Sequence, residues 1–302
     1  MRPAPEGALF DVRHLSVYRY AVPVSSCVMS LRLQPRQDRD QRVERCVIEA
    51  EPTGSMAAGR DGFGNPWHLL AVRSTHQKLE LLSRSRVGTT ARSEPSRGAG
   101  QVGWDDYRTL APDPEHWDFI GDSAFARPSP ALTSFADRNG LSRPVAEPLA
   151  DLAGLSAAIH REFEFAPGST TASSPIEDML ESGRGVCQDY AHLMIALARG
   201  WGVPSRYASG YLYIADDAGT PIRQTAMHAW VECLLPDGSW VGFDPANDCP
   251  VGGGYIRVAV GRDYGDVAPT AGVYEGGWES ELTVEIDVIP ALSRSHAARN
   301  PH

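Results

Sequence analysis

The stretch RGVCQDYAHLMIALARGWGVP, residues 184–204, decides the interpretation of the chain. Its apolar residues recur at steps of three and four residues, which is the spacing of one face of an α-helix. The sequence GWG at 200–202, followed by Pro204, predicts that the helix ends there. Cys187 is therefore expected in the first turn of this helix.

A cysteine at the start of a helix has a physical reason to be reactive. The first N–H groups of a helix lack intrahelical partners, and together with the helix dipole they favour negative charge. Such a place favours the thiolate over the thiol, and the thiolate is the nucleophile. The same N–H groups can stabilise an oxyanion that forms beside the sulfur.

The stretch HAWVECLLPDGSWVGFDP, residues 228–245, predicts a β-hairpin around its PDGS turn. His228 begins the first strand and Asp244 ends the second, so the two side chains belong to neighbouring strands. A nucleophilic cysteine needs a base and a group that orients the base. We therefore predict a catalytic triad in which Cys187 is the nucleophile, His228 is the general base and then the general acid, and Asp244 orients the imidazole.

The triad depends on the length of the hairpin loop. A two-residue loop would pair Val231 with Asp244, and side-chain alternation would then place Asp244 and His228 on opposite faces. The triad requires a one-residue slip, which a three- or five-residue loop, a bulge, or departure of Asp244 from the ladder would provide. We predict such an irregularity, with an Asp244 oxygen within about 3.2 Å of an imidazole nitrogen. A regular hairpin would instead make Asn247 the orienting residue.

Each triad residue also has a structural interpretation. Cys187 could be a small buried hydrophobe, His228 a core histidine and Asp244 the cap of a turn.

Asp189 is expected to interact with the helix dipole or to touch substrate. His192 lies about 140° around the helix from Cys187, so packing is its expected role. Trp230 and Trp240 are expected in the core, where an indole N–H could assist an oxyanion. Arg262-Asp263-Tyr264 are expected to form an ion pair in a loop near the site. Cys233 and Cys249 are expected to be inert thiols.

Outside this centre, the chain divides into regions of different pattern. Residues 8–90 alternate apolar and polar residues between turns such as DGFGNP (61–66), which predicts an N-terminal antiparallel β-domain. Residues 91–145 are expected to form a linker with short helices. Residues 146–290 are expected to form the catalytic core, with a helix over 147–163 and a last strand at 281–289. Residues 291–302 are expected to be a flexible tail. The predicted fold class is α+β.

Composition excludes several classes of protein. The 302 residues carry 28 Lys and Arg against 38 Asp and Glu, a net charge of −10, which argues against a nucleic-acid partner. The sequence has neither an apolar run long enough to span a membrane nor a signal-peptide pattern. Five cysteines without CxxC spacing argue against a disulfide framework, and we expect a cytoplasmic protein. The sequence implies no cofactor and no metal. Calcium in particular is not expected, because the sequence has no DxDxDG-type loop. The oligomeric state stays open.

Several quoted stretches together resemble one family. GRGVCQDYAHLMIALARGWGVPSRYASGYL (183–212) and HAWVECLLPDGSWVGFDPAND (228–248) resemble the core of bacterial transglutaminase-like proteins. HLSVYRYAVPVSSCVMSLRLQPR (14–36) and DGFGNP resemble the N-terminal β-region of one subgroup. The resemblance implies a papain-like α+β core, a Cys-His-Asp triad and acyl transfer through a thioester. One departure from the family pattern is QTAMHAW (224–230). An acidic residue is expected shortly before the histidine, and this chain has Thr225 and Met227 there instead.

Three functions follow from this interpretation. The first is a cysteine peptidase or amidase that hydrolyses a peptide, isopeptide or other amide bond. The second is a transferase of the protein-glutamine gamma-glutamyltransferase type, in which an amine replaces water. The third is a non-catalytic binding module on the same fold, which the complete triad disfavours. Peptide or protein-derived amides are the expected substrates.

Overall fold

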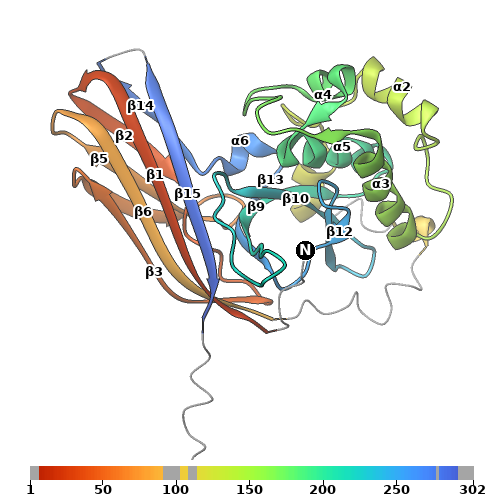
Figure 1. The fold of residues 1–302 in the computed structure, drawn as a ribbon. Coiled ribbons are helices and arrows are strands. Elements are labelled where there is room, and N and C mark those ends of the chain that lie inside the picture. Colours follow the sequence, from red (N-terminus) through yellow and green to blue (C-terminus); the bar gives the residue numbers. More distant parts are fainter. Residues whose placement is uncertain (1–6, 91–102, 108–113, 277–278, 292–302) are drawn as a thin grey trace, which may run out of the picture.

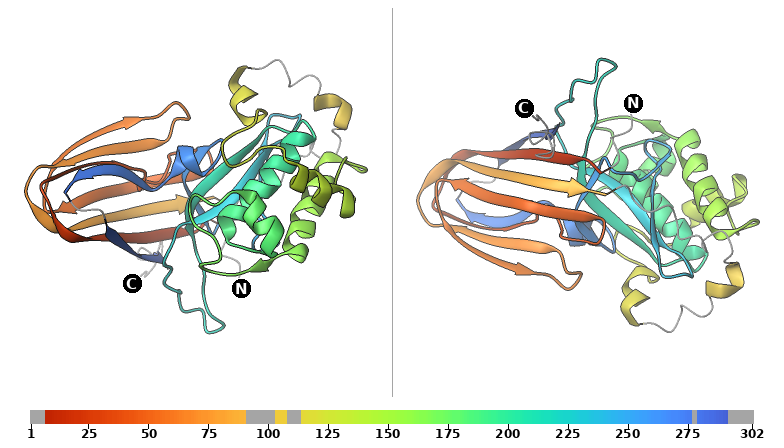
Figure 2. Two further views of the ribbon diagram at one scale, coloured as in Figure 1. Left: turned by 90° about the horizontal axis from the view of Figure 1, so that it is seen from above. Right: turned by 90° about the horizontal axis from the view of Figure 1, so that it is seen from below.

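The computed structural model describes residues 7–90, 103–107, 114–276 and 279–291. A β-sandwich lies beside a five-stranded sheet that is covered by helices (Figure 1). Figure 2 shows the sandwich at one end of the molecule and the helices gathered at the other. The predicted α+β class with an antiparallel N-terminal region is confirmed. Much of the expected linker and nearly all of the expected tail lie outside the described residues.

The sandwich contains two four-stranded antiparallel sheets, with the orders β15-β1-β6-β3 (sheet A) and β14-β2-β5-β4 (sheet B). Val, Leu, Ile and Tyr alternate with polar residues along these strands, and the apolar sides of the two sheets face each other. The strands are β1 (Leu9–Val24), β2 (Ser26–Leu31), β3 (Gln41–Glu51), β4 (Ser55–Arg60), β5 (Pro66–Val72), β6 (His76–Thr89), β14 (Thr270–Glu275) and β15 (Ser280–Pro290).

The second part is built on an antiparallel sheet of order β12-β11-β10-β9-β13. Helix α5 packs against β9 and β10, and α3 packs against α5. The strands are β9 (Ser205–Leu212), β10 (His228–Leu234), β11 (Trp240–Asp244), β12 (Cys249–Pro250) and β13 (Tyr255–Gly261), with a small parallel pair β7 (Glu164–Phe165) and β8 (Arg184–Gly185). The helices are η2 (Trp104–Asp106), η3 (Pro114–Phe119), α2 (Pro130–Arg138), α3 (Pro148–Glu162), α4 (Ile176–Ser182), α5 (Cys187–Gly200) and α6 (Tyr264–Val267).

The helices follow the sequence pattern closely. The helix expected over 147–163 is α3, and α4 ends at Gly183, whose φ of 72° gives the left-handed cap that glycine favours. Within the described parts of the chain, the longest helix has 15 residues, and none has the length and apolar character needed to cross a membrane.

The expected boundary of 146–290 for the catalytic core implied that the last two strands belong to its sheet. They belong to the sandwich instead. Strand β14 pairs with β2, and β15 pairs with β1 along eleven positions from Phe10↔Pro290 to Tyr20↔Ser280. The expectation was wrong here because alternation predicts a strand but does not identify its partner. Residues 270–290 therefore complete the edges of the sandwich.

The inward face of sheet A packs against two different partners. At one end, Tyr20 and Leu81 pack against sheet B. At the other end, Phe10 and Val12 pack against Tyr211 of β9 and neighbouring residues of β13. The sandwich and the helix-covered sheet thus share one apolar interface, which fixes them relative to each other.

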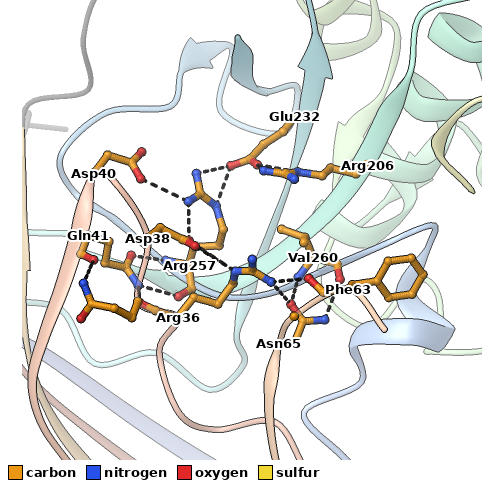
Figure 3. Close-up of polar contacts among 12 residues, drawn as sticks. Arg36, Asp38, Asp40, Gln41, Phe63, Asn65, Arg206, Glu232, Arg257 and Val260 are labelled. Carbon is orange, nitrogen blue, oxygen red and sulfur yellow. Dashed lines mark hydrogen bonds and ion pairs between the residues drawn. The ribbon is translucent and has the colours of Figure 1, made fainter. Parts of the chain in front are cut away.

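A buried polar network also joins the two parts (Figure 3). Arg257 of β13 donates to Glu232 of β10 at 2.6 and 2.9 Å and to Asp38, near the start of β3, at 2.8 Å. Arg206 of β9 donates to the other Glu232 oxygen at 2.7 Å, and Glu232 is 1% exposed. Gln41 completes the junction by hydrogen bonding to the backbone of Arg257. Each buried charge is therefore paired.

This network predicts an asymmetric response to substitution. Arg257→Leu leaves one oxygen of the buried Glu232 carboxylate without its cation and removes one of the two guanidinium groups that pair with Asp38, the other being that of Arg36. We therefore expect a loss of about 3–5 kcal/mol in the free energy of unfolding. Urea denaturation followed by circular dichroism measures this loss. The matched control is Arg262→Leu, which removes an exposed pair with Asp266 and should cost less than about 1 kcal/mol. Equal losses would contradict the prediction.

Candidate active site

Cys187 is the first residue of α5, as predicted. The chain enters the helix tightly at Gly185, where an added Cβ would lie 2.9 Å from the sulfur of Met179 and 3.1 Å from Asp189. Asp189 closes the helix start by accepting a hydrogen bond from the backbone N–H of Val186 at 2.8 Å. The Cys187 side chain is partly exposed and lies where the free N–H groups of the helix begin.

The hairpin contains the predicted one-residue slip. Leu234 pairs with Trp240, and the backbone N–H of Leu235 donates to the carbonyl of Ser239 at 2.8 Å. Three residues, 236–238, therefore form the loop, and Gly238 adopts a φ of 81° there. In this register Val231 pairs with Phe243. Asp244 then lies on the same face as His228, and a regular two-residue hairpin is excluded.

The Asp244 carboxylate is fully buried and accepts five hydrogen bonds. One oxygen accepts from His228 Nε2, Asn247 Nδ2 and the Tyr255 hydroxyl, each at 2.7 Å. The other accepts from the backbone N–H groups of Ala246 at 3.0 Å and Asn247 at 3.1 Å. Burial alone would raise the pKa of Asp244, but the His228 charge and these hydrogen bonds lower it. The carboxylate is held ionised and in one orientation.

His228 is held between Asp244 and Cys187. Burial favours its neutral form, but the Asp244 charge and hydrogen bond, followed by those of Cys187, raise its pKa from 6.5 to about 10. Because Asp244 engages Nε2, the nitrogen that faces Cys187 is Nδ1. Trp230 stacks beside the imidazole with ring centroids 6.4 Å apart. The site therefore favours an imidazolium beside the Cys187 sulfur.

Cys187 and His228 line a cleft of about 700 Å³. Tyr207 and Ser209 of β9 line it from the core, and the segment 223–227 lines it before His228. His14 and Ser16 of β1 line it from the sandwich. The sandwich is thus part of the wall of the candidate active site, which no sequence pattern had indicated.

Two residues at the site were missed or only partly anticipated. Tyr255 was not considered, because its contact with Asp244 joins β13 to the end of β11 and has no local signal. Asn247 was considered only as a replacement for Asp244. In the structure it donates to Asp244 through both its side chain and its backbone, so it supports the carboxylate instead of replacing it.

The other candidates have structural contacts. Asp189 is fully buried and caps α5, with its pKa raised chiefly by burial. His192 accepts a hydrogen bond from the Tyr264 backbone N–H, and burial lowers its pKa to about 3, which agrees with a packing role. The Trp230 indole N–H donates to Glu232, and the Arg206 guanidinium lies 4.0 Å from the Trp240 ring centroid. Neither indole is placed as an oxyanion donor by these contacts.

The ion pair expected within Arg262-Asp263-Tyr264 is wrong in its partner. Arg262 pairs with Asp266, four residues along, at 2.8 Å. Asp263 instead caps α6 by accepting from the backbone N–H of Gly265 at 2.9 Å. Sequence adjacency suggested the wrong carboxylate, because the short helix α6 brings the fourth residue, not the next, beside the guanidinium.

Comparisons with known proteins identify similar sequences and a similar fold. A profile of the “Transglutaminase-like superfamily” matches residues 139–245, and one of the “Bacterial transglutaminase-like N-terminal region” matches residues 10–88. An uncharacterised protein of Mycobacterium tuberculosis is 34% identical over 297 residues, covering 93% of this chain and 92% of that protein. The similarity thus extends across both parts of the fold.

Two further proteins are informative about the core and the fold. A “Protein-glutamine gamma-glutamyltransferase” of Pseudomonas aeruginosa is 29% identical over 123 residues, covering 39% of this chain and 18% of that protein. The crystal structure of “a Putative Cysteine Protease from Cytophaga hutchinsonii” superposes with a TM-score of 0.75 at 19% identity, covering 96% of this chain and 92% of the other. The second similarity shows a shared fold.

The raised pKa of His228 predicts a pH-dependent stability. Because the pKa of His228 is higher in the folded state than in the unfolded chain, its protonation stabilises the fold. This contribution is complete when the pH is below the unfolded pKa of 6.5, and it is lost as the pH rises through the folded pKa of about 10. Asp244→Asn removes the charge that causes the shift. We expect the free energy of unfolding to fall more between pH 6 and pH 10 in the wild type than in Asp244→Asn. Urea denaturation at the two pH values tests this, and parallel losses would contradict it.

Cys187 is predicted to be the most reactive thiol. Burial raises the pKa of the other four thiols, and for Cys233 it does so to about 12. Limiting iodoacetamide followed by peptide mapping should label Cys187 first, and His228→Ala should slow that labelling because the adjacent cation is removed. Earlier labelling of Cys27 or Cys46 would overturn the assignment.

Proposed function

Because this chain belongs to the transglutaminase-like superfamily, we propose that it is a cysteine-dependent acyl-transfer enzyme with the triad Cys187, His228 and Asp244. The observation that carries the proposal is the 2.7 Å hydrogen bond between His228 Nε2 and Asp244, in a cleft that His228 shares with Cys187. A binding module would have no need to keep a buried carboxylate ionised behind an imidazole that faces a thiol.

The first half of the proposed reaction forms a thioester. The Cys187 thiolate attacks the carbonyl carbon of an amide, and the carbonyl electron pair moves onto oxygen. The backbone N–H groups at the start of α5 stabilise this oxyanion. As the electron pair returns, the C–N bond breaks, and the His228 imidazolium gives its Nδ1 proton to the departing amine. The products are the acyl-enzyme, a free amine and a neutral imidazole.

The second half returns the enzyme to its starting state. Neutral His228 takes a proton from a water molecule at Nδ1, and the water oxygen attacks the thioester carbon. The C–S bond then breaks, which releases the carboxylic acid and restores the thiolate and imidazolium. Throughout, Asp244 holds Nε2–H, so that Nδ1 is the nitrogen that exchanges the proton.

We favour hydrolysis because Cys187 is partly exposed in an open cleft, where water reaches the thioester. Transfer to an amine is the second candidate. The Pseudomonas aeruginosa relative is named a protein-glutamine gamma-glutamyltransferase, and the same thioester serves both reactions. Peptide or protein-derived amides are the proposed substrates. We place the enzyme in the cytoplasm, because all five cysteines lie in the described ranges and are free thiols.

Intact-mass spectrometry distinguishes the two candidates. The protein is incubated with a set of N-acetyl dipeptide amides, without hydroxylamine and with hydroxylamine at a low and a high concentration. We expect an acyl adduct on Cys187 and release of the free acid as the main product. A predominant hydroxamate at low hydroxylamine would favour the transferase. Cys187→Ala is the control and should form no adduct, and an adduct that persists in this variant would overturn the proposal.

A further inference from the structure

An apolar strip on β15 continues from the protein core into the catalytic cleft. Even-numbered residues of this strand point inward, and Ile286 and Val288 are almost completely buried against β1 and β13. Val284 and Leu282 continue the same face and line the cleft. Leu282 is 47% exposed although it lies on the inward face. Leu282 and Val284 therefore give the cleft a stretch of apolar wall on the side of the sandwich.

Apolar side chains line the cleft both on this strand and next to His228. Val284 and Met227 line the cleft and pack against the same apolar cluster, and Met227 immediately precedes His228. The imidazole and Leu282 thus belong to one cleft whose wall includes the apolar side chains of Met227 and Val284. This accounts for the methionine at 227, where the family resemblance led us to expect an acidic residue nearby.

Apart from the Cys187–His228 pair, the cleft wall around this strip carries no uncompensated charge among the described residues. Among the described residues that line the cleft, Arg223 is the one with a permanently charged side chain. Its guanidinium is held by Asp287 at 2.7 and 3.1 Å and by Glu285 at 3.2 Å, so its charge is compensated. His14 lies in the same wall, where burial lowers its pKa to about 4 and keeps it neutral. A charged substrate group bound against Val284 and Leu282 would lose hydration without gaining an opposite charge from these side chains.

Resting on the proposed function, we infer that the substrate carries a neutral apolar group beside the scissile carbonyl, and that this group binds against Met227, Val284 and Leu282. The sandwich would then determine specificity through its last strand, while the core performs the chemistry. The substrate class is an amide with an aliphatic or aromatic side chain next to the cleaved bond, as opposed to an acidic or basic one.

The inference is tested by alkylation of Cys187 with N-alkyl iodoacetamides of increasing chain length. Each reagent forms a C–S bond with the thiolate and releases iodide, so no substrate needs to be known. We expect the second-order rate constant to rise about twofold to fourfold for each added methylene, as apolar surface is buried. A reagent of equal length that ends in a carboxylate should react no faster than iodoacetamide itself.

Three variants locate the effect. Leu282→Asp should abolish the dependence of the rate on chain length, and Leu282→Ala should weaken it. Ile289→Asp is the control, because Ile289 is 50% exposed on the outward face of the same strand. A wild-type rate that does not change with chain length would overturn the inference alone. Slow reaction of Cys187 with iodoacetamide itself would instead count against the proposed function.

Discussion

The pairing of β10 with β11 is the constraint on which the candidate site depends. A strand alternates its faces at every residue, so the length of the 236–238 loop determines whether Asp244 meets His228 or points away from it. The loop is stabilised locally, since Asp237 accepts from both the backbone N–H and the hydroxyl of Ser239 at 2.9 and 2.6 Å. The turn at the far end of the hairpin therefore determines whether the Asp244 carboxylate can reach the imidazole. The five hydrogen bonds to Asp244 then hold that carboxylate in place.

The second organising feature is the shared inward face of sheet A. Its two apolar ends pack against sheet B and against the core, and between them stand the polar residues His14 and Ser16. The Tyr211 hydroxyl uses its proton to donate to the carbonyl of Leu33. The hydroxyl oxygen must therefore accept the hydrogen bond from His14 Nδ1. In the neutral imidazole, His14 Nε2 then accepts from the Ser16 hydroxyl. The catalytic cleft opens at this polar interval. The sandwich is accordingly part of the site and not an independent module.

Local patterns predicted what depends on neighbours in sequence. The 3.6-residue period and the glycines predicted the position of Cys187, and side-chain alternation identified the slip that the His228–Asp244 contact requires. Long-range pairing was not predictable in this way. The alternation of residues 281–289 indicated a strand, but nothing in it distinguished β1 from a strand of the core as its partner. Tyr255 reaches Asp244 only through the closure of the sheet, for the same reason.

The return of the chain to its beginning also affects how the protein can be made. Strands β1 and β2 are synthesised early, yet β15 and β14, which pair with them, follow more than 200 residues later. Until then, both sheets expose an unpaired strand edge, and such edges associate with other chains. A nascent chain that stopped before residue 270 would already contain all three triad residues and would still lack both protecting strands. Closure of the sandwich therefore depends on the segment that is synthesised after the rest of the fold.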